Sequence, residues 1–351
     1  MDVISTASTE LAKKLVRPEL LGLEPYQSAR RIGGQGDIWI NANESPFNNT
    51  ELDGINRYPE CQPPALINAY AQYSNILPNH VLCTRGADEA IELLIRTYCR
   101  SGIDSIAYFA PTYGMYAISA ETSNIKANRL ELDDNYKLPN AFKSQITTEK
   151  IIFLCNPNNP TGTLLPETQI VDMLESYPNK LIVIDEAYVE FCPNVSFVKK
   201  IQQYSNLVIL RTLSKAFALA GLRCGFLLAN SGIIEMIMRV IAPYPVPHPV
   251  VKYATSALSS NGISNMISQV SLLNEQGIKL SQALNKHAEK VLPSSGNFVL
   301  AFFKNSETIQ NLLTNSGIVA RFYNDEHLKN AIRFSYTNQQ STIIIINALN
   351  R

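Results

Sequence analysis

The chain has 351 residues, of which 46% are apolar, and its 30 lysines and arginines balance its 30 aspartates and glutamates. This length and apolar content are sufficient for a large buried core and favour two or more domains. Because the charges balance, the chain offers no strongly basic surface to a nucleic-acid backbone, and we expect no nucleic-acid partner.

Cysteine, histidine and apolar residues are distributed in a way that argues against three further classes of protein. The six cysteines, from Cys61 to Cys224, form no CxxC pair, and the four histidines are scattered. We therefore expect neither a disulfide framework nor a metal site. No run of ~18 apolar residues could cross a membrane, and the N-terminus lacks the basic and apolar regions of a signal peptide. These features predict a cytoplasmic protein.

The first two thirds of the chain predict one large domain. A helix is expected around Leu11–Leu15 and a strand at Asp37–Ile40. From residue 81 onward, short apolar runs alternate with helical patterns at 88–98 and 167–177. The runs are typical of strands buried on both faces of a mainly parallel sheet, and they lie at 81–83, 105–110, 150–155, 180–184, 206–210 and 225–229. This alternation predicts an α/β fold with a three-layer αβα domain of roughly 200 residues.

The pattern changes after residue 249 and indicates a second, smaller α/β domain. The segment Pro243–Pro249 contains four prolines and predicts a stiff connector. It is followed by a long helical stretch, an apolar run, another helix and two short strands, at 250–291, 297–303, 307–315, 318–320 and 331–335. We therefore expect an N-terminal segment that packs with the small domain, a large domain and a small C-terminal domain, over 1–40, 41–249 and 250–351.

Two polar residues follow apolar runs, where ligands bind in an open α/β sheet. Asp185 ends one run, and a carboxylate there is partly desolvated and needs a cation; a helix cap or a structural ion pair would explain it equally well. Lys215 precedes the almost wholly apolar stretch 216–222. We expect it to be buried, because apolar surroundings favour the neutral amine that a Schiff base requires.

Three further segments predict an anion site and a turn. Thr212, Ser214 and Arg223 combine hydroxyls with a forked guanidinium, which is typical of phosphate binding. The segment Gly86–Glu89 follows a strand and opens a helix, so its backbone N–H groups suit the same anion, although acidic residues also favour first turns. By composition, Asn156–Gly162 is a turn.

The order of these motifs resembles a known family. Asn159-Pro-Thr-Gly162, Asp185-Glu-Ala-Tyr188, Ser214-Lys215 and Arg223 resemble the fold-type-I, aspartate-aminotransferase-like enzymes that use pyridoxal phosphate. More narrowly, nearly the whole chain resembles histidinol-phosphate aminotransferases, on blocks at Pro25–Arg31, Asn56–Glu60, Arg85–Glu89, Pro111–Tyr116 and Arg211–Gly225. Two places depart from that pattern: Ser45 stands where asparagine is usual, and no glycine follows Arg333 closely.

The resemblance implies roles around the cofactor. Lys215 would hold pyridoxal phosphate as a Schiff base and later move the substrate proton. Asp185 would keep the ring nitrogen protonated, and Tyr113 would stack on the ring. Asn159 and Tyr188 would bind the ring oxygen. The phosphate would be bound by Ala87, Asp88, Thr212, Ser214 and Arg223. The resemblance also implies a homodimer, in which Tyr58 reaches the cofactor phosphate of the neighbouring subunit.

It further implies that Tyr26, Asn159, Arg321 and Arg333 bind the substrates. One guanidinium fork accepts either the phosphate of histidinol phosphate or a carboxylate of glutamate and 2-oxoglutarate, although exposed strand arginines are the alternative explanation. The predicted activity is a ping-pong transamination in histidine biosynthesis. It interconverts L-histidinol phosphate and 2-oxoglutarate with imidazole-acetol phosphate and L-glutamate.

Three alternatives stay open. An aromatic amino-acid aminotransferase or a threonine-phosphate decarboxylase would keep Lys215, Asp185 and Arg223 and differ around the substrate. A regulatory module that senses pyridoxal phosphate would need a DNA-binding segment, for which we expect neither room nor a basic patch in this sequence.

Overall fold

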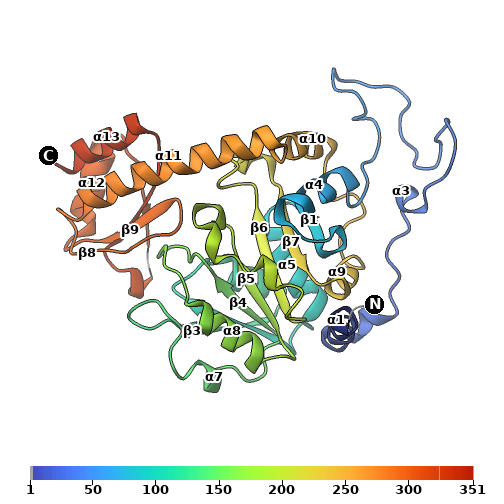
Figure 1. Cartoon of the computed structure of the whole chain (residues 1–351), viewed down its shortest axis with the longest axis horizontal. Coiled ribbons are helices and arrows are strands. Elements are labelled where there is room, and N and C mark those ends of the chain that lie inside the picture. The colour runs from blue at the N-terminus through green and yellow to red at the C-terminus, as the bar shows by residue number, and fades with distance from the viewer. Residues whose placement is uncertain (1–2, 324, 351) are drawn as a thin grey trace.

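The computed structural model describes residues 3–323 and 325–350, which form two separate β-sheets with helices packed on them (Figure 1). The larger sheet has seven strands, in the order β1 (Val81–Thr84), β7 (Gly225–Ala229), β6 (Leu207–Thr212), β5 (Leu181–Asp185), β4 (Ile151–Cys155), β2 (Ser105–Ala110) and β3 (Lys126–Glu131). Strand β7 is antiparallel to both β1 and β6, and the other strand pairs of this sheet are parallel. The predicted α/β fold with a mostly parallel sheet is confirmed.

Both faces of the large sheet are covered, which explains its continuous apolar runs. In β5, Ile182 and Ile184 face one core cluster, whereas Leu181 and Val183 face the other. The first cluster is covered by α4 (Pro64–Ser74), α7 (Phe142–Gln145), α8 (Glu167–Ser176) and α10 (His248–Ala257). The second cluster is covered by α5 (Ala87–Tyr98), α6 (Met115–Glu121) and α9 (Ser231–Ile237).

The smaller sheet has four antiparallel strands, in the order β10 (Arg321–Phe322), β11 (Ala331–Ser335), β9 (Phe298–Phe302) and β8 (Lys290–Val291). It packs against α11 (Ser260–Leu284), α12 (Ser306–Asn315) and α13 (Gln339–Leu349). The strand predicted at 318–320 lies instead at β10. The single helical stretch predicted over 250–291 is two helices, because the Ser259 hydroxyl accepts the Gly262 N–H and begins α11 anew.

The expectation that the N-terminal segment packs with the small domain is wrong for α1 (Val3–Leu15). This helix lies against α9 on the large sheet, at the opposite side of the molecule from the small sheet (Figure 1). Leu11 and Leu15 are buried in the same core cluster as α9. The contact is close, since a Cβ at Gly232 would lie 2.6 Å from Thr9 Cα. The apolar face of α1 is therefore buried against the large sheet and its helices, and not against the small domain.

The expected strand at Asp37–Ile40 is also absent. Ile38 and Ile40 are 86% and 88% exposed, and the segment has no strand partner. It belongs to an arm over 22–62, with α2 (Pro18–Leu21) before it and α3 (Ala29–Ile32) within it, that extends away from the body (Figure 1). Without a neighbouring strand its backbone cannot form a ladder. The expected domain boundaries after residues 40 and 249 stay predictions.

Six short 3-10 helices complete the described elements: η1 (Pro78–His80), η2 (Val189–Phe191), η3 (Pro193–Val195), η4 (Val198–Lys200), η5 (Ala220–Leu222) and η6 (Glu326–Leu328). Among the helices of the described residues, none is both long and apolar enough to cross a bilayer.

Candidate active site

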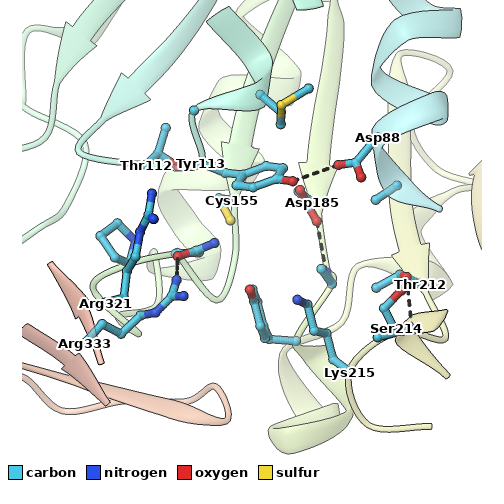
Figure 2. A pocket seen from close by; sticks show the side chains of 18 of the residues that line it. Asp88, Thr112, Tyr113, Cys155, Asp185, Thr212, Ser214, Lys215, Arg321 and Arg333 are labelled. Atoms are coloured by element: carbon cyan, nitrogen blue, oxygen red, sulfur yellow. Dashed lines mark hydrogen bonds between the residues drawn. The ribbon is translucent and has the colours of Figure 1, made fainter. Parts of the chain in front are cut away.

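A cavity of about 600 Å³ lies between the carboxyl ends of the large-sheet strands and the small sheet (Figure 2). It gathers most of the residues that the sequence singled out, which come from eight separate segments: Ala87, Asp88, Tyr113, Asn159, Asp185, Tyr188, Thr212, Ser214, Lys215, Arg223, Arg321 and Arg333. Parallel strands place the residues that follow them at one edge, which is why distant segments meet here.

Asp185 forms the buried floor of this cavity and is 3% exposed. Its Oδ2 accepts the Tyr116 hydroxyl at 2.8 Å, and its Oδ1 accepts the Ala187 N–H at 3.0 Å. Burial nevertheless raises the pKa of Asp185 to about 6. A carboxylate in this environment is stabilised by a cation placed against it.

Lys215 extends into the cavity from the loop after β6, and its Nζ lies 5.5 Å from the centre of the Tyr188 ring. The side chain is exposed to the cavity, so the expectation that apolar neighbours bury it is wrong. The run 216–222 forms a loop and η5, and Ala218 and Ala220 are exposed as well. The cavity walls still remove enough water to lower the pKa of Lys215, and the Arg333 guanidinium lowers it further.

The N-terminus of α5 is the centre of a group of anion-binding side chains. Arg223 Nη2 donates to Asp88 Oδ2 at 3.1 Å, and the Tyr113 hydroxyl donates to Asp88 Oδ1 at 2.8 Å. Thr212 Oγ1 donates to Ser214 Oγ at 2.9 Å nearby. Free helix N–H groups, two hydroxyls and a guanidinium at one point suit a phosphate.

Two glycines allow the strands below this helix terminus to approach closely. Gly86 has φ +91°, which favours glycine. A Cβ at Gly225 would lie 2.7 Å from Gly86 Cα, closer than side-chain carbon atoms come to backbone. Gly225 therefore keeps β7 close to the residue that precedes α5.

The small sheet supplies two guanidinium groups to the opposite wall. Arg321 and Arg333 are paired across β10 and β11, and Figure 2 shows both facing the cavity from one side. Arg333 Nη1 donates a short hydrogen bond to Asn159 Oδ1, whereas its buried Nε has no partner in the described part of the chain. The two cations lie opposite Lys215, as a substrate with an anionic end would require.

Four further residues belong to the site although the sequence assigned them no role: Tyr116 contacts Asp185, and Thr112, Cys155 and Tyr323 line the cavity. Tyr116 donates its hydroxyl to Asp185 Oδ2 at 2.8 Å, a contact that a buried tyrosine requires but that the local sequence does not indicate. Thr112 Oγ1 donates to Asn158 Oδ1 at 2.7 Å. Cys155, which pairs with Asp185 across β4 and β5, and Tyr323, two residues after Arg321, carried no signal.

Tyr26 and Tyr58 are the two expected site residues that the fold does not bring to the cavity. Both lie on the arm, and they are 68% and 48% exposed. The Tyr58 ring stacks on Tyr244, with 4.3 Å between ring centres and 16° between planes. For Tyr58 this position is compatible with a role outside its own subunit.

Comparisons with known proteins agree with this architecture. The sequence model of aminotransferase class I and II matches residues 35–349. The chain therefore belongs to the aminotransferase class I and II family.

Within that family, its similar relatives are histidinol-phosphate aminotransferases. The protein from Shewanella oneidensis is 57% identical over 97% of this chain and 90% of its own length. The one from Vibrio parahaemolyticus is 47% identical over 93% and 95%. The crystal structure of histidinol-phosphate aminotransferase from Clostridium acetobutylicum superposes with a TM-score of 0.75 at 27% identity, over 81% of this chain and 87% of that one.

Proposed function

We propose that the chain interconverts L-histidinol phosphate and 2-oxoglutarate with imidazole-acetol phosphate and L-glutamate, using pyridoxal phosphate. One observation carries the proposal: a single cavity combines Lys215 and Asp185 from the large sheet with Arg321 and Arg333 from the small sheet. The names of the relatives, at up to 57% identity, support the same activity.

The residues present fit the cofactor by their chemistry. The buried carboxylate of Asp185 suits a protonated ring nitrogen, because that cation would offset the burial that raises the pKa of this group. The ring oxygen would be held by Asn159 and Tyr188, and the ring face by Tyr113. The phosphate would be held at the start of α5 by Ala87, Asp88, Thr212, Ser214 and Arg223. When bound, pyridoxal phosphate supplies an electron sink for charge that develops at the substrate Cα.

Lys215 would act twice. Its Nζ would hold the cofactor covalently and, once released by substrate, would take the proton from the substrate Cα. A general base must be neutral to accept a proton, and the lowered pKa of Lys215 favours that form. The Arg333 guanidinium contributes to this lowering, so one residue would bind substrate and adjust the base.

Arg321 and Arg333 would bind the end of the substrate that lies away from the reacting carbon. A planar fork accepts two oxygens from a phosphate or a carboxylate, so the same pair can serve both half-reactions. The resemblance to the family adds Tyr26, which lies on the arm, to this substrate site. This site accounts for the use of one phosphorylated substrate and one dicarboxylate.

The active unit would be a homodimer in the cytoplasm, with Tyr58 of one subunit at the cofactor phosphate of the other. The exposed apolar side chains of the arm support this assembly, since a large exposed apolar surface usually marks an interface.

A half-reaction tests the proposed activity. Histidinol phosphate added to the cofactor-loaded protein should replace the visible absorbance of the bound aldehyde by that of pyridoxamine phosphate, with release of imidazole-acetol phosphate. A spectral change with phenylalanine but not with histidinol phosphate would contradict the proposed substrate. Release of CO2 from phosphothreonine would contradict transamination.

A further inference from the structure

The exposed arm contains one buried carboxylate. Whereas most side chains between residues 22 and 62 face solvent, the Glu44 side chain is 3% exposed. A buried carboxylate is unfavourable unless cations and hydrogen-bond donors surround it. Glu44 should therefore be surrounded by such groups.

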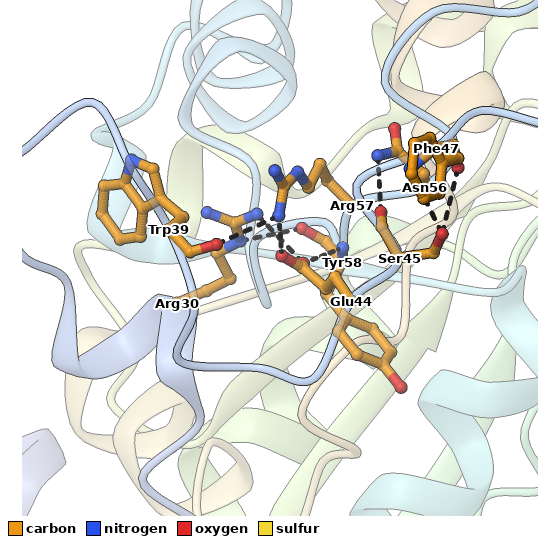
Figure 3. A network of polar contacts seen from close by, with 8 residues as sticks. All are labelled: Arg30, Trp39, Glu44, Ser45, Phe47, Asn56, Arg57 and Tyr58. Atoms are coloured by element: carbon orange, nitrogen blue, oxygen red, sulfur yellow. Dashed lines mark hydrogen bonds and ion pairs between the residues drawn. The ribbon is translucent and has the colours of Figure 1, made fainter.

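Glu44 accepts hydrogen bonds from three groups of the arm (Figure 3). Its Oε2 accepts Arg57 Nη1 at 2.9 Å. Its Oε1 accepts Arg30 Nη2 at 3.1 Å and the backbone N–H of Tyr58 at 2.7 Å. Burial would raise the pKa of Glu44, but the Tyr58 N–H and the two guanidiniums lower it below the ordinary value. The carboxylate is thus a charged centre that joins three segments of the arm.

Tyr58 is held on both sides of its backbone by this network. Glu44 accepts its N–H, and Arg30 Nε donates to its carbonyl oxygen at 3.0 Å. The Arg30 guanidinium also lies 5.3 Å from the centre of the Trp39 ring, which fixes the arginine itself. The backbone is clamped while the phenol stays half exposed. This arrangement presents the side chain and restrains the residue that carries it.

The charges of the network favour an anionic partner. Two guanidiniums and one carboxylate leave one net positive charge next to the Tyr58 backbone. A residue on an unsupported arm would also lose backbone freedom when it binds, whereas a clamped residue loses less. Both effects lower the cost of bringing the phenol to a phosphate group.

We propose that Glu44 is a positioning residue. It fixes the backbone of Tyr58 directly and by holding Arg30, so that the Tyr58 hydroxyl meets the cofactor phosphate of a second copy of the chain. This inference rests on the proposed function, in which Tyr58 serves the neighbouring subunit.

The test compares Glu44→Ala with Glu51→Ala, an exposed glutamate of the same arm that makes no polar contact in the described part of the chain. The dissociation constant of pyridoxal phosphate is measured by absorbance titration of the dimer. Hydrogen exchange of peptides covering 52–62 is followed by mass spectrometry. Glu44→Ala should raise the dissociation constant about 10-fold and speed exchange at Tyr58, while Glu51→Ala should change neither. Sedimentation confirms that each variant is dimeric.

A double variant separates positioning from general damage. Since Glu44 acts through Tyr58, adding Glu44→Ala to Tyr58→Phe should weaken cofactor binding no further, within about 2-fold. Arg30→Met, which removes the hydrogen bond to the Tyr58 carbonyl, should weaken cofactor binding and speed exchange as Glu44→Ala does. It tests the inference independently if Glu44→Ala dimerises poorly.

Two unfavourable outcomes have different meanings. If Tyr58→Phe leaves cofactor affinity unchanged, the proposed role of Tyr58 fails, and the inference falls with it. If Tyr58→Phe weakens binding while Glu44→Ala and Arg30→Met speed exchange without weakening binding, the inference alone is overturned.

Discussion

Asp185 illustrates how the surroundings of one residue determine its chemistry. It is a carboxylate at the end of an apolar strand, with a tyrosine hydroxyl and one backbone N–H as its donors. These two hydrogen bonds offset only part of the unfavourable burial, so the pKa of Asp185 stays raised, at about 6. The ionised form of Asp185 is therefore more favourable with a cationic ligand group against it than without one.

This raised pKa predicts how the stability of the cofactor-free protein depends on pH. The folded state holds the Asp185 proton more tightly than the unfolded state, so the group stabilises the fold at low pH and this contribution is lost as the pH rises through 6. Asparagine does not titrate, so the unfolding free energy of Asp185→Asn should lack this loss. The difference between the variant and wild type should therefore shift by about 2–3 kcal/mol in favour of the variant from about pH 4 to about pH 8. Urea denaturation at both pH values measures this difference. The exposed Asp134→Asn serves as the control, and a pH-independent difference would contradict the assignment.

The two arginines of the small sheet should differ when each is replaced by lysine, which keeps the charge and loses the fork. For Arg321→Lys we expect KM for both substrates to rise about 10-fold with little change in kcat. Arg333→Lys should also lower kcat, because Arg333 holds Asn159 and lies near Lys215. Steady-state kinetics on both substrates measure the difference; identical profiles for the two variants would show that Arg333 acts only in binding.

At the scale of elements, the packing of β1 on β7 determines whether α5 can begin at the cavity. Gly225 leaves no room for a Cβ, since backbone atoms of Gly86 and Ala87 lie within 2.9 Å of that position. Any residue could adopt the backbone conformation of Gly225. Glycine is required there because a side chain would collide with the neighbouring backbone.

Gly225→Ala should destabilise the protein by about 1–3 kcal/mol and weaken cofactor binding, because the added methyl group pushes β7 away from the start of α5. Gly221→Ala is the matched control, since a Cβ there meets no atom within 4 Å. Thermal denaturation and cofactor titration of both variants give the result. Equal stability of the two variants would refute the close-contact argument.

The elements differ in how well the sequence predicts them. Strands β4 to β7 were predictable, because sheets covered on both faces require continuous apolar runs. The polar strand β3 was missed, since it lies at a sheet edge and its side chains are largely accessible. The path of Asp37–Ile40 could not be predicted, because a strand needs a partner that local sequence does not specify.

The residues of the candidate site show the same division. Asp185 was identified because it follows an apolar run at the edge where ligands bind. Arg223 was identified because its guanidinium combines with the hydroxyls of Thr212 and Ser214 into a phosphate site. The exposure of Lys215 to the cavity was not predicted, since the apolar run after it forms a loop instead of burying it. The hydrogen bond from Tyr116 to Asp185 depends on the packing of α6 against the sheet, which no local pattern encodes.

At the scale of the whole molecule, the cavity has walls from two sheets, and direct contacts join the parts of the chain that carry them. The Ser295 N–H donates to the Gly162 carbonyl at 2.8 Å, and Arg129 of β3 pairs with Asp325 at 2.9 Å. These contacts, together with the bond from Arg333 to Asn159, fix the substrate wall relative to the cofactor wall. The arm is the part that completes the site in the proposed dimer.

Borohydride reduction is the direct test of whether this cavity binds pyridoxal phosphate at Lys215. Reduction of the cofactor-loaded protein, followed by proteolysis and mass spectrometry, should place the added mass on the peptide that carries Lys215. Lys215→Ala should carry no label and should lose transamination by at least about a thousandfold. A label on a different lysine, or near wild-type activity of Lys215→Ala, would contradict the proposed role of Lys215.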